Sequence, residues 1–410
     1  MKEPKIRFKG FSGEWKRSTL GDLALFSKGS GYSKSDICKE GTPVILYGRM
    51  YTKYQSVFDE IDTFVNPKDN SVVSKGGEVI IPGSGESSED ISLAAMVKNE
   101  GVILGGDLNI LKFNQKVNDP TFMSMAITYS PTRAELSSYS QGKTVVHLRN
   151  SEIAKGTIRY PNISEQNTIV NYVLSLDAQI SASTSRLASL KQVKAASLQA
   201  MFPQEGETVP KVRFKRFEGE WKKVKLNTFA KRIMRKNSNL ESSLALTIAS
   251  AYGLVSQAEY FNNLVVGSNI QNYYLLKKGE FAYNKSYSNG YPFGSVKRLD
   301  SYEQGILSTL YIVFSIDNSV SSDYITHFFD TTLWHKEIAE RAEEGARNHG
   351  LLNIATRDFF DIYIWMPDSV KEQQSIASFF TSLDRQIALH TQRLEKLKQI
   401  KAACLDKMFV

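Results

Sequence analysis

The chain has few of the features that would place it outside the cell or in a membrane. Only Cys38 and Cys404 of its 410 residues are cysteines, and two thiols cannot build the disulfide framework of a secreted domain. No stretch approaches the roughly 18 apolar residues of a membrane span. The first residues, Met1–Phe8, also lack the apolar core of a signal peptide. We therefore expect a cytoplasmic protein with no membrane partner.

Signatures of common catalytic sites are missing as well. Gly142-Lys143-Thr144 resembles the end of a phosphate-binding loop, but Ser137 stands where the first glycine belongs. No two prolines are adjacent, so the Asn/Asp-Pro-Pro-aromatic signature of amino methyltransferases is absent. None of the five histidines starts a zinc-protease motif, since Lys-Glu-Ile-Ala follows His335. We expect neither catalysis nor a metal site in this chain.

Composition leaves an ordinary globular protein with a basic bias. Hydrophobic residues make up 41% and charged residues 23% of the chain, which is ordinary for a globular protein, and 410 residues are enough for two or three domains. The net charge is +8, and the segment Lys211–Lys236 holds eleven Lys and Arg against two Glu. Such a segment is either a solvated surface or an edge that contacts phosphates.

The main positive feature is a sequence that occurs twice, 206 to 207 residues apart. Pro4–Lys16 returns as Pro210–Lys222 with 10 of 13 positions identical. Ser164–Phe202 returns as Lys371–Phe409 with 20 of 39 identical and no gap. The regions between these repeats have diverged. A duplicated frame with two unlike inserts suits a protein that holds two different recognition heads.

The two copies of the longer repeated segment, Ser164–Phe202 and Lys371–Phe409, each predict a long amphipathic helix. Apolar residues recur in steps of three and four, a heptad stripe typical of a coiled-coil seam. Asn162 before Glu165, and Ser369 before Glu372 in a capping box, mark the two helix starts. The predicted seam residues are Ile169, Val173, Leu176, Ile180, Ser183, Leu187, Leu190, Ile376, Phe380, Leu383, Ile387, His390, Leu394 and Leu397.

Helix length leads to a geometric expectation. About 40 residues span roughly 60 Å at 1.5 Å per residue, so the heads should lie tens of Å apart. A pseudo-two-fold relation between the halves requires antiparallel helices that meet at their midpoints. We therefore predict that Ser183 and His390 form a polar layer at mid-seam, where such residues usually set the register.

The inserts predict mixed structure with more strand than helix. Alternating or short apolar runs predict strands at 43–47, 77–81, 93–97, 101–104, 108–113, 244–248, 272–276, 280–283 and 307–314. Helical patterns occur at 121–129 and 322–342. The predicted class is α+β, with a first head at 1–160, helices at 161–203 and 367–410, and a second head at 204–366 that includes a linker at 204–210.

Polar and aromatic side chains gather in one segment of each insert. Tyr47–Tyr54 and Tyr283–Tyr291 combine Arg, Lys or Asn with several Tyr and hydroxyl groups. Arg and Lys suit guanine O6 and N7, and Asn suits adenine N6 and N7. Such segments also occur as ordinary surface turns, so the pairing of two of them on one frame carries the argument.

With these features the chain resembles the specificity subunit of a Type I restriction–modification enzyme over essentially its whole length. The matching segments in the first half are Tyr47–Tyr54, Ile81–Ser87, Gly105–Leu111 and Gly142–Leu148. In the second half they are Gly345–Leu352 and the Glu372-Gln373 pair that repeats Glu165-Gln166.

The resemblance implies two target recognition domains, each contacting half of a split DNA sequence in the major groove, on an antiparallel coiled coil that sets their spacing. Two modification subunits with S-adenosylmethionine, and restriction subunits with ATP and Mg, would assemble on a non-catalytic frame. Candidate DNA-contacting residues are Tyr47, Arg49, Tyr51, Thr52, Lys53, Tyr54, Ser84, Lys143, His147, Asn284, Lys285, Ser286, Tyr287, Asn289, Arg347 and His349.

Two other interpretations remain open. A stand-alone pseudo-dimeric DNA-binding regulator would bind its site tightly without enzyme partners. A protein–protein scaffold would bind DNA weakly, with little response to salt, whereas a DNA-sequence reader should lose affinity steeply as salt rises.

Overall fold

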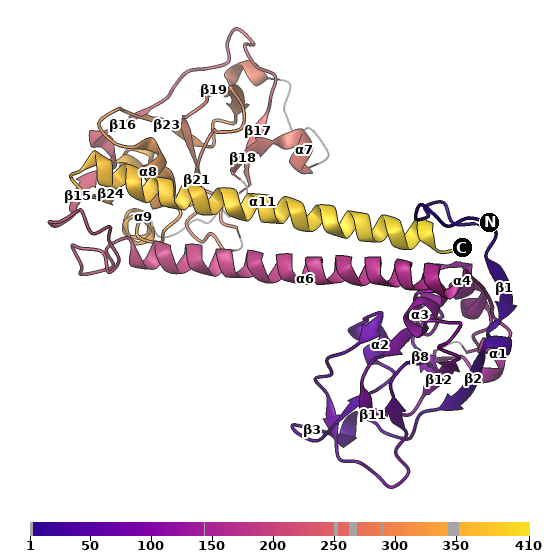
Figure 1. Ribbon diagram of the computed structural model, residues 1–410. Coiled ribbons are helices and arrows are strands. Elements are labelled where there is room, and N and C mark those ends of the chain that lie inside the picture. Colours follow the sequence, from indigo (N-terminus) through magenta and orange to yellow (C-terminus); the bar gives the residue numbers. More distant parts are fainter. Residues whose placement is uncertain (1–2, 143, 250–252, 262–268, 289, 343–351) are drawn as a thin grey trace. The chain divides into compact units, whose positions relative to one another are not determined.

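The computed structural model describes residues 3–142, 144–249, 253–261, 269–288, 290–342 and 352–410. The chain forms two compact units (Figure 1). Unit 1 comprises Met1–Thr184 and Gln392–Val410, and unit 2 comprises Ser185–Thr391. Each unit therefore holds one head and a part of both long helices. The four-segment division at residues 160, 203 and 366 stays a prediction.

Both long helices are present as predicted: α6 spans Ile163–Ala200 and α11 spans Val370–Met408. Asn162 Oδ1 accepts a hydrogen bond from the backbone N–H of Glu165 at 3.0 Å, which confirms the first N-cap. The predicted capping box at the second start is wrong. The Glu372 carboxylate instead accepts from the Arg213 guanidinium at 2.7 and 2.9 Å, because an ionised donor makes the stronger hydrogen bond.

The heptad stripe is buried within each unit. In unit 1 the early part of α6 packs against the late part of α11, and in unit 2 the late part of α6 packs against the early part of α11. The helices therefore run antiparallel in each unit, as predicted. Of the seam residues, Ile169, Val173, Leu176, Ser183, Leu190, Ile376, Phe380, Leu383, Leu394 and Leu397 are buried, and Ile180, Leu187, Ile387 and His390 are half-buried.

Two ion pairs set the helix register, one in each unit. Asp177 of α6 pairs with Lys401 of α11 in unit 1. Lys194 of α6 pairs with Asp384 of α11 in unit 2, at 2.7 Å. Each pair is the image of the other, because Asp384 and Lys401 lie 207 positions after Asp177 and Lys194.

This register does not pair Ser183 with His390. Ser183 lies six residues after Asp177, and Glu395 lies six before that residue's α11 partner, so Ser183 is level with Glu395 in unit 1. By the same count in unit 2, His390 is level with Ala188. The predicted polar layer is wrong because the ion pairs move the symmetry centre two to three residues along each helix. His390 Nδ1 is buried with no hydrogen-bond partner.

The two copies of the shorter repeated segment, Pro4–Lys16 and Pro210–Lys222, each pack at the start of one long helix, and we call each copy a brace. In unit 1 the Arg7 guanidinium donates to both carboxylate oxygens of Glu165, at 2.7 and 2.8 Å. In unit 2 Arg213 does the same to Glu372. Each brace also includes a short antiparallel ribbon. These ribbons pair β1 (Lys16–Thr19) with β14 (Thr157–Tyr160), and β15 (Lys222–Lys225) with β24 (Tyr363–Met366).

The end of each helix packs beside the brace of the other repeat. Ile6 N–H donates to Lys407 O at 3.1 Å in unit 1, and Val212 N–H donates to Ala200 O at 2.8 Å in unit 2. The two termini of the chain therefore lie together in unit 1 (Figure 1). Phe409 packs against the Phe122 ring at 5.6 Å, and it belongs to the core of that unit.

The first head contains two five-stranded sheets. One has the order β2 (Ala24–Lys28), β12 (Leu108–Phe113), β8 (Glu78–Pro82), β10 (Ala95–Val97) and β5 (Val57–Phe58). The other has the order β3 (Ile37–Cys38), β6 (Phe64–Val65), β4 (Thr42–Ile45), β11 (Glu100–Leu104) and β7 (Val73–Lys75). A small ribbon pairs β9 (Ser84–Gly85) with β13 (Val146–His147). The helices of the first head are α1 (Leu20–Leu23), α2 (Arg49–Thr52), α3 (Pro120–Tyr129), α4 (Pro131–Ser138) and α5 (Asn150–Ile153).

The second head has a four-stranded sheet with the order β16 (Ala230–Arg232), β23 (Ile312–Ile316), β20 (Phe281–Asn284) and β21 (Ser295–Arg298). Two further ribbons pair β17 (Leu246–Ala249) with β18 (Gly253–Ser256), and β19 (Tyr274–Lys277) with β22 (Gln304–Leu307). Its helices are α7 (Gln257–Phe261), α8 (Ser322–Phe328), α9 (His335–Arg341) and α10 (Thr356–Phe360). Among the described residues no helix combines the length and apolar character that crossing a bilayer requires.

Two elements predicted in the second head are wrong. The expected strand at 307–314 is broken between β22 and β23, where Tyr311 N–H donates to Ser308 O in a turn. The expected helix at 322–342 is two helices. Between them, Thr331 Oγ1 donates to Phe328 O and Trp334 Nε1 donates to Phe329 O, and these bonds hold a turn.

The diverged heads share one strand arrangement. In the first head β8 lies between β12 and β10, and in the second β20 lies between β23 and β21, with all pairs antiparallel. Asn109 faces Ile81 in the first head, just as Ile312 faces Tyr283 in the second. Registers therefore match strand for strand, although the sequences do not.

Candidate nucleic-acid interface

Three neighbouring strands of the first head end at one edge. The strand β2 ends at Lys28, β8 ends at Pro82, and β12 begins at Leu108. The ribbon of β9 and β13 lies beside them, because Leu148 N–H donates to Gly83 O at 3.0 Å. Loops at such an edge can present side chains to a partner while the sheet holds them in place. We call this the first-head edge.

Charged and polar side chains meet at the first-head edge. Ser84 Oγ donates to Asp107 Oδ2 at 2.8 Å. Asp107 has a left-handed backbone with φ of 59°, a conformation that costs energy in a non-glycine residue and that clusters at functional sites. His147 faces Ser84 across the ribbon. The edge thus brings together Ser84 and His147, both predicted from sequence, and adds Asp107.

Lys28 and Arg149 complete the first-head edge. Partial burial lowers the pKa of Lys28, the charge of Asp107 raises it, and the charge of Arg149 lowers it further. Asn150, next to Arg149, donates through Nδ2 to Ser27 O at 3.0 Å, which fixes the loop to β2. Sequence reasoning missed Lys28, Asp107 and Arg149. The Gly105–Leu111 match pointed to one of them, but only the pairing of strands brings all three together.

The Tyr47–Tyr54 segment forms α2, and its cations already have an acidic partner. The Arg49 guanidinium binds Asp62 and lies over the Phe58 ring at 5.5 Å. Lys53 Nζ lies 3.0 Å from the other Asp62 oxygen. Hydrogen bonds from Lys53 and Arg49 hold the pKa of Asp62 well below its usual range. In the free protein these two cations are therefore neutralised.

The hydroxyl groups of the same segment are mostly used internally. Tyr54 donates to Ala94 O at 3.0 Å, and burial raises its pKa. Thr52 Oγ1 donates to Gly48 O at 2.8 Å. The Tyr47 and Tyr51 rings lie 6.4 Å apart. Tyr54 and Thr52 therefore support α2, and the Tyr47 and Tyr51 rings are the side chains that this segment offers to a partner.

In the second head the predicted segment lies on the equivalent edge. Asn284 ends β20, and its Oδ1 accepts from Ser286 N–H at 3.0 Å. Lys285 O accepts from Leu352 N–H at 3.0 Å, which repeats the bond between Gly83 and Leu148. Asn284–Tyr287 thus corresponds to the Pro82–Gly85 segment of the first head rather than to Tyr47–Tyr54. We call it, with the start of β23 and the residues after β16, the second-head edge.

Four predicted residues lie outside the described part of the chain. They are Lys143, Asn289, Arg347 and His349.

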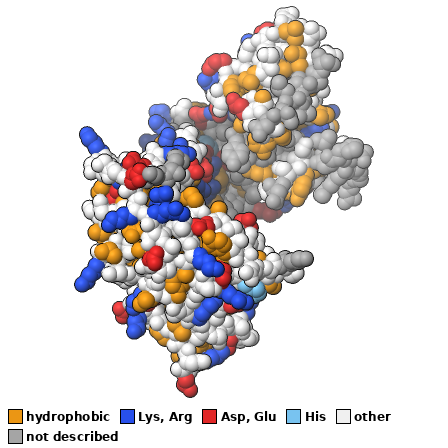
Figure 2. Space-filling view, turned by 90° about the vertical axis from the view of Figure 1, so that its right-hand side faces the viewer, with side chains coloured by type: hydrophobic (Ala, Val, Ile, Leu, Met, Phe, Trp, Pro, Cys, Tyr) orange, Lys and Arg blue, Asp and Glu red, His pale blue; other side chains and the backbone are white. Residues whose placement is uncertain are grey.

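The basic segment Lys211–Lys236 is partly neutralised. Arg213 binds Glu372, Lys222 binds Asp368 at 2.7 Å, and Arg235 binds Glu280 at 2.5 Å. On the face shown in Figure 2, the described Lys and Arg side chains are dispersed among hydrophobic and uncharged groups. Part of the segment is thus engaged in ion pairs, and Lys231 and Arg232 on β16 are among its exposed cations.

Most of the chain matches one protein family, in two successive segments. The family model described as "Type I restriction modification DNA specificity domain" matches residues 12–192 and again 218–399. The chain belongs to the Type I restriction–modification DNA specificity family. Each match covers one head with one long helix, so the duplication inferred from the sequence is a duplication of this domain.

One of three similar solved structures supports the fold of this family. The Type I restriction–modification S subunit from M. genitalium has a TM-score of 0.62 and 14% identity over 100% of this chain and 99% of that one. An HsdS subunit from Thermoanaerobacter tengcongensis has a TM-score of 0.46 and 14% identity over 96% of each chain. A structure titled for complex assembly and conformational transition of a Type I system has 0.47 and 14%, over 96% and 97%. No curated protein sequence matches the chain.

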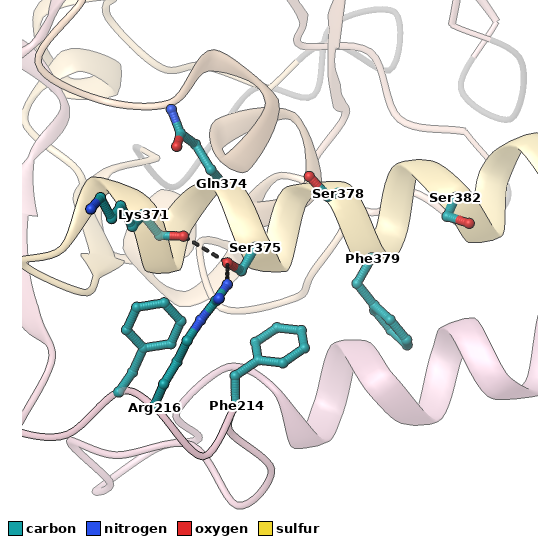
Figure 3. Close-up of a pocket in the computed structure, with 9 residues that line it drawn as sticks. Phe214, Arg216, Lys371, Gln374, Ser375, Ser378, Phe379 and Ser382 are labelled. Carbon is teal, nitrogen blue, oxygen red and sulfur yellow. Dashed lines mark hydrogen bonds between the residues drawn. The ribbon is translucent and has the colours of Figure 1, made fainter.

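This specificity chain also has a groove in unit 2 (Figure 3). Its volume is about 840 Å³. Arg216 Nη2 donates to Ser375 Oγ at 2.7 Å, and Ser375 donates to Lys371 O at 2.8 Å. The groove is lined by Phe214, Arg216, Phe217, Lys371, Gln374, Ser375, Ser378, Phe379 and Ser382.

Three of the nine residues that line the groove are identical in the other half of this specificity chain. Phe214, Phe217 and Ser382 have identical counterparts in Phe8, Phe11 and Ser175. The cations do not recur, since Gly10 and Ser164 stand in place of Arg216 and Lys371. Half-buried aromatic rings kept in both copies indicate a surface that serves both copies, and the cations distinguish the second.

A charged cluster beside α11 has the geometry of a metal site, but it contains its own cations. His327, Asp330 and Asp384 place potential ligand atoms within 4.8 Å of one another. Lys194 Nζ lies 3.0 Å from Asp330 and 2.7 Å from Asp384, and Lys297 Nζ lies 2.9 Å from Asp330. Burial raises the pKa of Asp330, but a hydrogen bond with His327 and the charges of Lys297 and Lys194 outweigh burial and hold the pKa low. We interpret the cluster as an ion-pair network that fixes the second head to both helices.

Proposed function

We propose that this chain binds a bipartite, asymmetric DNA sequence, one half-site through each head, and that it does so without catalysing a reaction itself. Contact would be made by the first-head and second-head edges in the major groove, with Tyr47 and Tyr51 of the Tyr47–Tyr54 segment at the border of the first. Its place of action would be the cytoplasm, where DNA and partner enzymes are available.

The observation that carries this proposal is the contrast between frame and edges. The Arg–Glu pairs of the braces and the inter-helix ion pairs repeat in the two units. The head edges share their strand register and differ in most of their side chains. A frame that repeats can hold two copies of one partner, and edges that differ can bind two unlike DNA sequences.

Two modification subunits would dock on the repeated surfaces, one per copy. The Phe214–Phe379 groove and its counterpart around Phe8 and Tyr172 are the regions we assign to them. Those subunits would bring S-adenosylmethionine and methylate adenine. Restriction subunits, with ATP and Mg, would join that core.

A direct test mixes the purified chain with its modification subunits and measures protection and methylation of host DNA. We expect methylation at a two-part motif with a constant spacer. Exchange of one head for the head of another specificity chain should replace one half of the motif and leave the other half. An unchanged motif after exchange of both heads would refute the proposal, and specific binding that needs no partner would favour the regulator.

The helices provide a second test. If α6 and α11 set the distance between heads, residues inserted in both at equivalent positions should change the spacer and not the half-sites. We expect half-sites about one helical turn, roughly 34–36 Å, apart on one face of the duplex. An altered half-site with an unchanged spacer would contradict the ruler role.

A further inference from the structure

The two head edges match in strand register and differ in chemistry at three strand ends. Lys28 faces Asn109 at the end of β2. In the second head Arg232 faces Phe314, so two residues later Met234 reaches the level of Ile312, the counterpart of Asn109. Met234 therefore occupies the place of Lys28.

Apolar residues replace charged or small ones at the two other strand ends. Leu310, two residues before Ile312, stands where Asp107 precedes Asn109, and Tyr287 stands where Gly85 follows Ser84. These three side chains are strongly exposed: Met234 by 55%, Tyr287 by 58% and Leu310 by 62%. The first-head edge instead offers ammonium, guanidinium and carboxylate groups.

Exposure of this kind indicates a partner. Met234 lies next to buried Ile233, yet it points away from the core that holds that residue. Exposed apolar side chains grouped at the ends of three adjacent strands are unfavourable in water unless another surface covers them.

Charge near the second-head edge favours nucleic acid as that surface. Lys231 and Arg232 on β16 are exposed and have no carboxylate within ion-pair distance among the described residues. Cations beside apolar groups match the two parts of a duplex groove, because phosphates flank the base edges.

The major groove presents one apolar group, the C5 methyl of thymine. We propose that the second head recognises its half-site in good part through thymine methyl groups, which Met234, Leu310 and Tyr287 contact. This inference rests on the proposed function, since it specifies the chemistry of one of the two half-sites. The first head would use hydrogen bonds from Lys28 and Arg149 to guanine and from cytosine N4 to Asp107.

Uracil in place of thymine tests the inference, because it removes the methyl and keeps every hydrogen-bonding group. The assay measures equilibrium binding, at one salt concentration, of the chain with its modification subunits to an unmethylated duplex that contains the motif identified by the methylation test. Thymines would be replaced separately in each half-site. Burial of one methyl corresponds to about a four-fold change in affinity. We expect a loss of about four-fold per contacted thymine in one half-site and little change in the other.

Substitution in the protein assigns the effect to the second head. Met234→Ala and Leu310→Ala should weaken binding to the thymine duplex and not to the uracil duplex. Val117→Ala, an equally exposed apolar position in the first head, should leave the thymine preference intact. The uracil effect on the unaltered chain does not depend on how well any variant folds.

Each outcome has a distinct meaning. Specific binding that tolerates uracil in both half-sites, or a second half-site made only of G·C pairs, would overturn the inference and leave the proposed function standing. Binding that does not distinguish the motif from a scrambled duplex would overturn the proposed function. A uracil effect that survives Met234→Ala and Leu310→Ala would move the methyl contact to other residues and refute the assignment.

Discussion

Lys194 of α6 lies 2.7 Å from Asp384 of α11. Each has an identical residue 207 positions away on the other helix, which is Lys401 for Lys194 and Asp177 for Asp384. The counterparts, Asp177 and Lys401, pair with each other in unit 1. Each repeat therefore gives one acid to one unit and one base to the other. Such a reciprocal pattern favours an antiparallel pair in one register, because a slipped register separates both pairs and a parallel pairing of equivalent residues would place like charges together.

The Asp177–Lys401 pair offers the cleaner test of this register. Asp177→Lys alone should destabilise unit 1, since it places two ammonium groups together on partly buried helix faces. The double change Asp177→Lys with Lys401→Asp should recover most of the loss. We expect a coupling of about 1 kcal/mol, in the range of partly exposed ion pairs. Urea denaturation of the unaltered chain, Asp177→Lys, Lys401→Asp and the double variant measures this coupling. Additive effects of the two single changes would mean that the pair does not set the register.

Asp330 should make unit 2 sensitive to acid. Its pKa is lower in the folded protein than its usual value, so it contributes stability that is full above about pH 4 and is lost as pH falls. Asp330→Asn leaves Lys297 and part of Lys194 without a partner and should cost about 3 kcal/mol near neutral pH. That cost should shrink below about pH 4, as measured by denaturant unfolding at several pH values.

Asp368→Asn is the matched control for Asp330. Asp368 also pairs with a lysine, but both side chains are mostly exposed, and we expect a change below about 1 kcal/mol. Equal costs for the two variants, or a cost for Asp330→Asn that does not change with pH, would contradict the network.

Asp62 should restrain non-specific DNA binding. Asp62→Asn would free Arg49 and Lys53 for phosphate contact, so affinity for unrelated duplex should rise. The slope of log affinity against log salt should steepen by about one to two. Preference for the specific motif should fall. Asp59→Asn, which removes an exposed acid paired with Lys98 in the same head, serves as control, and an equal effect of the two changes would show that only net charge matters.

Phe409 should be as important for unit 1 as an interior residue, although it stands one position from the chain's end. It is buried among Phe122 and Tyr129. Phe409→Ala should therefore cost about 3–5 kcal/mol. Leu389→Ala, at an exposed position of α11, should change stability by about 0.5 kcal/mol or less. Thermal or denaturant unfolding distinguishes the two, and a small effect at Phe409 would mean that the helix end is not part of the core.

Local patterns in the sequence determined the frame. The heptad stripe and the Asn162 cap act within a few residues, so α6 and α11 follow from sequence alone, as does their antiparallel pairing from the duplication. The register could not be predicted, because seam spacing is satisfied at several offsets. Only the Asp177–Lys401 and Lys194–Asp384 contacts select one of them.

Tertiary structure decided the candidate interface. Strand pairing joins residues far apart in sequence, so nothing local shows that Lys28, Asp107 and Arg149 converge, that Asp62 neutralises Arg49, or that Met234 takes the place of Lys28. The sequence by itself determined a duplicated frame with two unlike heads. The fold decided which side chains those heads present, because a sheet edge is assembled from strands whose order no short-range pattern records.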